Sequence, residues 1–212
     1  MAIRVRFLVT LAVGATVAWG QPAPIVQPGA PGTATTTVAP AKAALAVRPK
    51  VAEGDVVFMQ GMIHHHSQAV EMVDLLRTGG ASKDLLALGE RITISQSDEM
   101  RFMKEWLMER GKPVAMAHDH AAHMAGGGMP LMPGMLTAAQ MATLAAAKGA
   151  AFDRLFLTGM IQHHTGALDM VDDLFDIPGA GQDPVMFDFA TDIDNTQRAE
   201  IEIMRRMLKE IR

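Results

Sequence analysis

The sequence predicts an all-α protein built around a four-helix bundle. Apolar residues recur at helical spacing in four long segments, and no alternating pattern typical of strands is found. The chain also contains an internal repeat, because Gly-Met-Ile-His-His-His at 61–66 returns as Gly-Met-Ile-Gln-His-His at 159–164. A repeat that keeps its register over the length of a helix indicates two copies of one structural unit.

The repeat covers two helices in each copy, so the unit is a helical hairpin. The first helices match at an offset of 98 residues, in the pairs Asp55 and Asp153, Phe58 and Phe156, Ala69 and Ala167, Met72 and Met170, Val73 and Val171, and Asp74 and Asp172. The second helices match at an offset of 101, where Ile92, Gln96, Glu99, Met103 and Leu107 correspond to Ile193, Gln197, Glu200, Met204 and Leu208. Two hairpins bury their four apolar stripes most economically in a bundle.

The first 50 residues predict export, followed by a linker. Residues 1–20 combine a short basic start, an apolar run and a small-residue end, which is the pattern of a cleaved signal peptide. The run is shorter than the roughly 20 residues of a membrane span, so cleavage is favoured over an uncleaved anchor, and no stable membrane insertion is expected afterwards. Residues 21–50 are rich in Pro, Ala and Thr and predict a disordered or polyproline-like linker. We therefore expect a secreted or periplasmic protein.

The four-helix domain is expected at 51–212, with repeat one at 52–111, a Met/His-rich loop at 112–136 and repeat two at 137–212. In repeat one, a helix from about Asp55 to Arg77 should end at Gly79-Gly80. Ser82 is the expected N-cap of a second helix that runs to about Glu109.

In repeat two, Thr137 and Gln140 form a capping box that opens a short extra helix. Gly149 separates it from a long helix over about 150–175. Asp183-Pro184 places an N-cap before a proline at the first helical position, and so starts a last helix that reaches nearly to Arg212.

Composition excludes several function classes. The net charge of −4 provides no basic surface for nucleic acid, and the lack of cysteine excludes disulfides, thiol nucleophiles and covalent haem attachment. The chain has no His-Glu-x-x-His, phosphate-loop or Gly-x-Ser-x-Gly motif. A di-iron bundle needs Glu three residues before its histidine, where Met62 and Met160 stand here. We expect no enzyme activity.

Each repeat instead carries Met-x-x-His-His, which brings a thioether and two imidazoles together within one helical turn. The candidate ligands are Met62, His65 and His66 in the first copy and Met160, His163 and His164 in the second, with Met100, Met103 and Met204 on the partner helices. Glu99 and Glu200 share the faces of those partner helices. These are ligand types for soft and borderline transition metals, so we expect two sites, one per hairpin. His64, which aligns with Gln162, should lie at the surface.

A structural role is the alternative for these residues. Methionine at helical spacing usually fills a core, and paired histidines can be hydrogen-bonded to facing Gln and Glu. The duplication of the motif favours metal. Copper suits it best, because thioethers ligate Cu(I), imidazole also ligates Cu(II), and thioether is not a usual zinc ligand.

The loop between the repeats has its own candidate ligands. It is rich in His, Met, Gly and Pro and has no hydrophobic period, and it contains His118, His120, His123 and Met124. His-rich tracts of this kind bind metal by composition. The alternative is a plain connector.

The Gly-Met-Ile-x-His-His motif, the segment 152–170 and the closing Gln197, Glu200 and Met204 resemble a bacterial family catalogued as domain of unknown function 305. The resemblance covers about 52–211. It implies a secreted, ferritin-like four-helix bundle, described in some members as copper-binding, with ligands at the Met and His positions of both motifs and at Met103 and Met204.

Together these observations predict an exported protein that sequesters or carries copper, with a metal ion as its partner. Two alternatives stay open. One is an electron carrier or enzyme with haem or a redox metal held by Met and His. The other is an interaction domain whose histidines are structural.

Overall fold

The computed structural model describes residues 25–27, 34–38, 51–115 and 131–211, which fall into one unit before Pro49 and one from Pro49 onward. In the first unit, strands β1 (Ile25–Gln27) and β2 (Thr36–Val38) pair antiparallel. The expectation of a chain without strands was wrong for these two segments. Both contain β-branched Ile, Val or Thr, whose side chains favour extended backbone.

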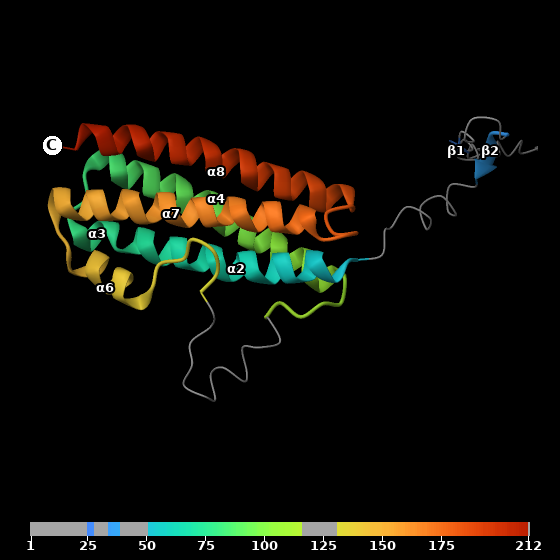
Figure 1. Ribbon diagram of the computed structural model, residues 1–212, viewed down its shortest axis with the longest axis horizontal. Coiled ribbons are helices and arrows are strands. Elements are labelled where there is room, and N and C mark those ends of the chain that lie inside the picture. The colour runs from blue at the N-terminus through green and yellow to red at the C-terminus, as the bar shows by residue number, and fades with distance from the viewer. Residues whose placement is uncertain (1–24, 28–33, 39–50, 116–130, 212) are drawn as a thin grey trace, which may run out of the picture. The chain divides into compact units, whose positions relative to one another are not determined.

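The second unit is a bundle of four long helices, which confirms the predicted all-α fold (Figure 1). The helices are α2 (Glu53–Asp74), α4 (Lys83–Glu109), α7 (Gly149–Asp176) and α8 (Pro184–Glu210). Helix α2 packs on α4 and α7 on α8, so each repeat forms a hairpin, and α2 also packs on α7. None of the described helices combines the length and apolar composition that crossing a membrane requires.

Two short helices complete the described part of the unit. Helix α3 (Leu76–Gly79) follows α2 after a break at Leu75, where one continuous helix was expected. The break is a tightened turn, because the Leu75 N–H donates to the Met72 carbonyl three residues back. Helix α6 (Ala138–Ala146) packs against α7 and is the predicted extra helix.

The helix starts follow the predicted capping residues. The Thr137 hydroxyl accepts from the Gln140 N–H while the Gln140 side chain accepts from the Thr137 N–H, which is a complete capping box. The Asp183 carboxylate accepts from two N–H groups in the first turn of α8. Ser82 is the N-cap of α4, but its side chain makes no capping bond.

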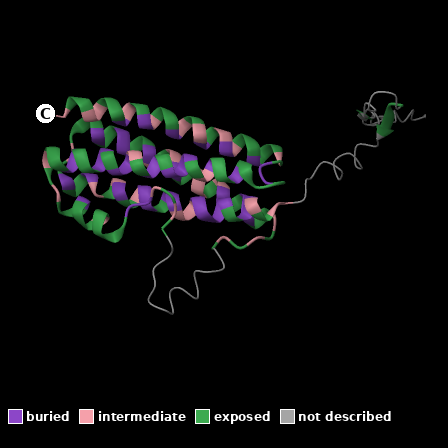
Figure 2. Ribbon diagram, viewed as in Figure 1, coloured by how far each residue is buried: buried purple, intermediate pink, exposed green. Residues whose placement is uncertain are grey.

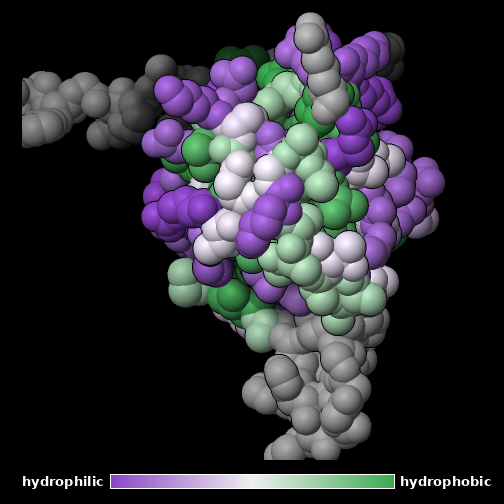
Figure 3. Space-filling view, turned by 90° about the vertical axis from the view of Figure 1, so that its left-hand side faces the viewer, coloured by the Kyte–Doolittle hydropathy of each residue, from purple (hydrophilic) through white to green (hydrophobic). Residues whose placement is uncertain are grey.

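Two equivalent aspartates tie the hairpins together. Asp153 on α7 accepts from the N–H of Ser82 at 3.2 Å, at the start of α4 in the other hairpin. Asp55 on α2 accepts from the N–H of Gly181 at 2.7 Å, in the turn before α8. Each motif helix therefore fixes the turn of the opposite repeat. Figure 3 shows the end of the bundle at which α7 begins, where hydrophilic and hydrophobic side chains intermingle. A pocket of about 390 Å³ beside Asp153 is also lined by Ser82 and Leu85 at the start of α4.

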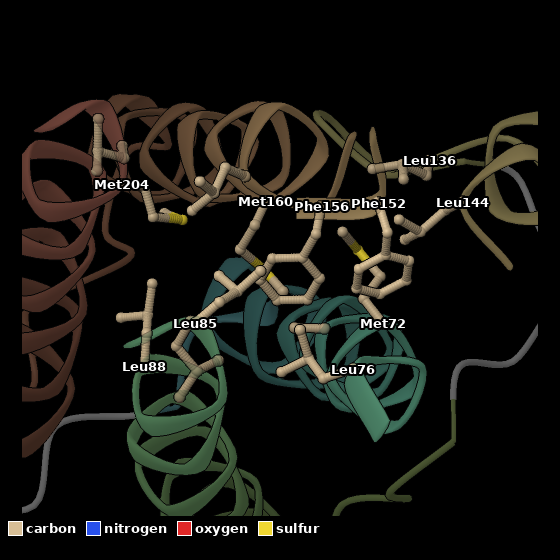
Figure 4. Close-up of a cluster of buried hydrophobic side chains, with 14 of the residues drawn as sticks. Met72, Leu76, Leu85, Leu88, Leu136, Leu144, Phe152, Phe156, Met160 and Met204 are labelled. Carbon is tan, nitrogen blue, oxygen red and sulfur yellow. The ribbon is translucent and has the colours of Figure 1, made fainter. Parts of the chain in front are cut away.

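The buried residues lie on the inner faces of the four long helices (Figure 2). They form two hydrophobic clusters, and the one with Phe152, Phe156, Met160 and Met204 is drawn in Figure 4. The other contains Met59, Met62, Met103, Leu107 and Met186. On every long helix, buried polar residues stand between residues of the two clusters, namely His65 and His66, Gln96, His163 and His164, and Gln197. The middle of the bundle is thus a polar layer between two apolar halves.

Candidate functional site

The central feature of the polar layer is a group of four histidines with no exposed surface. His65 and His66 come from α2, and His163 and His164 come from α7. The rings of His65 and His163 lie 3.8 Å apart between centroids, at an angle of 38°. The two motifs therefore meet in one layer, a contact between the hairpins that the sequence did not predict. The reason is that α2 and α7 pack directly against each other.

The outer histidines of the layer each pair with a glutamate of the partner helix. His66 Nε2 lies 2.5 Å from Glu99 Oε2, and His164 Nε2 lies 2.6 Å from Glu200 Oε2. The two glutamates are nearly buried, with 18% and 13% of their side chains exposed. This is the predicted approach of α4 to the first motif and of α8 to the second. A carboxylate that accepts from Nε2–H orients the ring. In a neutral imidazole it also leaves the lone pair on the other nitrogen, Nδ1.

The inner histidines bond to backbone carbonyls instead. His163 Nε2 donates to the carbonyl of His65 at 3.0 Å, and His65 Nε2 donates to the carbonyl of Pro133 at 3.0 Å. A carbonyl can only accept, so the proton of each neutral ring sits on Nε2. In each case Nδ1 carries the lone pair.

All four Nδ1 atoms are buried and have no hydrogen-bond partner among the described residues. A buried polar atom without a partner costs about 1–3 kcal/mol, so proteins rarely retain one without a reason. Here four such nitrogens share one layer. The lone pair of a neutral imidazole nitrogen is what binds a metal ion.

Burial keeps the inner histidines neutral. Desolvation, assisted by the neighbouring His66, lowers the pKa of His65 from 6.5 to about 3. Burial and then the adjacent His65 hold the pKa of His163 well below 6.5. Both rings therefore remain uncharged at neutral pH, and protons do not compete with a metal for their lone pairs.

The motif methionines lie on either side of the layer. Met62 and Met103 share one hydrophobic cluster, Met160 and Met204 share the other, and none of the four has exposed surface. Met100 is half-buried. In the described part of the chain, no three His, Asp or Glu side chains converge so as to hold a metal ion.

The described end of the inter-repeat loop, residues 131–136, packs against the histidine layer, and we call it the loop segment. Gly134, at φ 73°, lies against Gly166 of α7, where a Cβ would come within 2.0 Å of the Pro133 carbonyl oxygen. On α2, Gln68 both donates to and accepts from the backbone of Leu136, at 2.9 and 2.7 Å. These contacts hold the Pro133 carbonyl against His65.

Sequence reasoning did not identify Pro133, Gly166 or Gln68. One signal was available, because Gln68 and Gly166 occupy the same position of the two repeats and differ where their neighbours agree. Gln68 forms hydrogen bonds to the loop segment, whereas Gly166 lets the backbone of that segment approach α7 closely because it has no side chain.

The remaining predicted residues have mixed outcomes. His64, expected at the surface, is half-buried, while Gln162 is exposed. The loop candidates His118, His120, His123 and Met124 lie outside the described residues.

The comparisons with known proteins identify relatives of the same architecture. The profile of the family described as domain of unknown function (DUF305) matches residues 55–208. No functionally curated protein matches the chain significantly. A DUF305 fragment from Deinococcus radiodurans is similar at 28% identity and a TM-score of 0.62, covering 76% of this chain and 99% of that one. A DUF305 protein of Streptomyces coelicolor, described as a candidate secreted protein, is similar at 27% identity and a TM-score of 0.64, covering 74% and 93%.

A third similar structure has a bound metal. CopM in its Cu(I)-bound form shares 28% identity at a TM-score of 0.55, covering 74% of this chain and 96% of that one. CopM has also been solved with Cu(II) and with silver. Metal binding therefore occurs among the structural neighbours of this chain.

Proposed function

The chain belongs to the DUF305 family, and from this premise we propose that it binds copper through the histidine layer and sequesters or carries it outside the cytoplasm. One observation carries the proposal, namely the four buried Nδ1 atoms that have no partner among the described residues. The copper-bound structures of CopM, a similar protein, also support the proposal. Nothing in the proposal requires catalytic turnover.

Cu(I) is the oxidation state that fits the layer best. The surroundings are apolar on both sides, and the cost of burying an ion rises with the square of its charge, so a monovalent ion is favoured over a divalent one. Either outer histidine, His66 or His164, can supply one imidazole ligand, and a second imidazole of the layer or a thioether of Met62, Met103, Met160 or Met204 then satisfies Cu(I) without further ligands. Glu99 and Glu200, which accept from the outer histidines, add negative charge nearby.

The location outside the cytoplasm rests on the first 20 residues. Their basic start, apolar run and small-residue end support export with cleavage before Gln21. The prediction is checked by N-terminal sequencing of the protein recovered outside the cytoplasm. An intact Met1 or Ala2 on that protein would contradict it.

The test of copper binding is a Cu(I) competition titration of the variant with both His66→Gln and His164→Gln. Glutamine keeps an N–H donor that can reach the glutamate, but it removes Nδ1. We expect the tightest Cu(I) affinity to fall at least tenfold, about 1.4 kcal/mol. The matched control is His64→Gln, which makes the same change outside the layer and installs the residue that repeat two already has at Gln162.

The two outcomes separate metal binding from a structural role. If the double variant is folded by circular dichroism and binds Cu(I) as tightly as the unmodified protein, the layer is a packing device and the proposal is wrong. If the control also loses affinity, the loss does not report on the layer, and the proposal is equally contradicted.

A further inference from the structure

A second feature outside the histidine layer also brings soft donors together. It is a groove of about 220 Å³ where α2, α7 and the loop segment meet, and its walls are mostly apolar. Met132 of the loop and Met170 of α7 line it, and Asp173 lies at its exposed rim. Neither methionine belongs to the Met-x-x-His-His motifs.

The two methionine side chains converge over a bare stretch of α2. The position that a Cβ on Gly61 would take lies 3.1 Å from Met132 Cε, 3.4 Å from Met132 Sδ and 3.4 Å from Met170 Cε. Because Gly61 has no side chain, the ends of both methionine side chains reach the same point. Each side chain has three rotatable bonds, so both sulfur atoms can turn toward one ion.

Accessibility separates this pair from the motif methionines. Met132 and Met170 are half-buried, whereas the four methionines beside the layer have no exposed surface. An ion arriving from solvent can therefore reach the groove without opening the bundle.

We propose that this groove is a separate capture site for a soft monovalent metal ion, with the thioethers of Met132 and Met170 as its ligands. A thioether is uncharged and polarizable, and it prefers Cu(I) or Ag(I) over hard cations. The carboxylate of Asp173 at the rim adds an attraction for any cation, and the apolar walls offer no competing donor.

The groove and the histidine layer are connected by two consecutive residues of the chain. Met132 directly precedes Pro133, whose carbonyl accepts from His65 Nε2 at 3.0 Å. An ion held at Met132 therefore sits one residue from a hydrogen bond of the layer. Its role as an entry point rests on the proposed function, whereas ion binding in the groove does not.

The test is a titration of the full chain, labelled with ¹³C in its methionine methyl groups, with Ag(I) as a redox-inert probe. We expect the methyl signals of Met132 and Met170 to shift together with one midpoint. In the variant Met170→Leu, the midpoint for Met132 should rise at least about tenfold, because a second ligand held nearby multiplies the affinity of the first. Leucine has nearly the volume of methionine, so the fold should be retained.

The matched control is Met108→Leu on α4, which removes a thioether with 60% exposure that does not line the groove. It should leave the midpoint for Met132 unchanged. The proposal is overturned if the methyl signals of Met132 and Met170 do not shift, or if the midpoint for Met132 is the same in Met170→Leu.

The groove and the layer can fail independently. In the variant with both His66→Gln and His164→Gln, the shifts of Met132 and Met170 should persist even though the layer no longer binds tightly. If they vanish together with the affinity of the layer, the groove is not a separate site and the proposal is overturned. If that double variant keeps its Cu(I) affinity, the proposed function fails while the groove is still judged by its own shifts.

Discussion

The imidazole rings of His65 and His163 lie 3.8 Å apart although 98 residues separate them in the chain. His163 also donates to the backbone carbonyl of His65, so the two repeats are joined at their own motif. The reverse bond is not made, because His65 donates to Pro133 instead. One loop carbonyl thus breaks the symmetry of the repeat at the centre of the bundle.

Replacing Gly166 with alanine should destabilise the protein by about 1–3 kcal/mol, the usual cost of forcing atoms into a packed site. The added Cβ would lie 2.0 Å from the Pro133 oxygen, so the loop segment must move away from His65. Urea denaturation measures the change. Gly61→Ala is the control, because its nearest neighbour is the flexible end of Met132 at 3.1 Å. Equal effects of the two substitutions would contradict the role of Gly166.

The stability of the metal-free protein should fall as the pH drops below about 6.5. The pKa of His65 is lowered to about 3 in the folded protein, so between these values the unfolded chain binds the proton and the folded one does not. One such histidine contributes at most about 1.4 kcal/mol per pH unit in that window. Urea denaturation at pH 7, 5.5 and 4.5 measures how steeply the free energy of unfolding depends on pH.

A His65→Asn variant should show a flatter dependence of stability on pH, since it removes one of the two inner histidines. His64→Gln, the control outside the layer, should retain the slope of the unmodified protein. An unchanged slope in His65→Asn would show that this histidine is not held neutral by burial.

Zinc should bind the histidine layer more weakly than Cu(I), by at least about tenfold. Zinc prefers four ligands and does not favour thioether, and the described residues do not gather three His, Asp or Glu side chains at one point. Competition titrations with each ion at about pH 7.5 provide the comparison. Equal affinities would mean that the ligand set differs from the one proposed.

Deleting residues 117–129 should lower the copper capacity without removing the tightest-bound ion. This segment contains His118, His120, His123 and Met124, which are ligand types that bind metal by composition, so its deletion should remove ligands while the histidines of the layer stay in place. Copper analysis after dialysis against chelators of graded affinity separates the two classes of site. Loss of the tightest ion in the deletion would move the main site from the bundle to the loop.

The sequence by itself determined the four helices, their capping residues and the duplicated motif. Thr137 and Asp183 start helices because their side chains accept from N–H groups a few residues away, and this chemistry is local. The pairing of Glu99 with the first motif and of Glu200 with the second also follows from the repeat register, since neighbouring helices of a hairpin must face each other.

The contact between His65 and His163, the Pro133 carbonyl and the convergence of Met132 on Met170 were decided only by the tertiary structure. Helical periodicity defines the inward face of each helix. It does not define which helix that face packs against, or which residues along the two helices come into contact. A backbone carbonyl is present at every residue, so no residue type marks the one that His65 uses. The two repeats form a single layer because α2 packs on α7, and that packing depends on all four apolar faces at once.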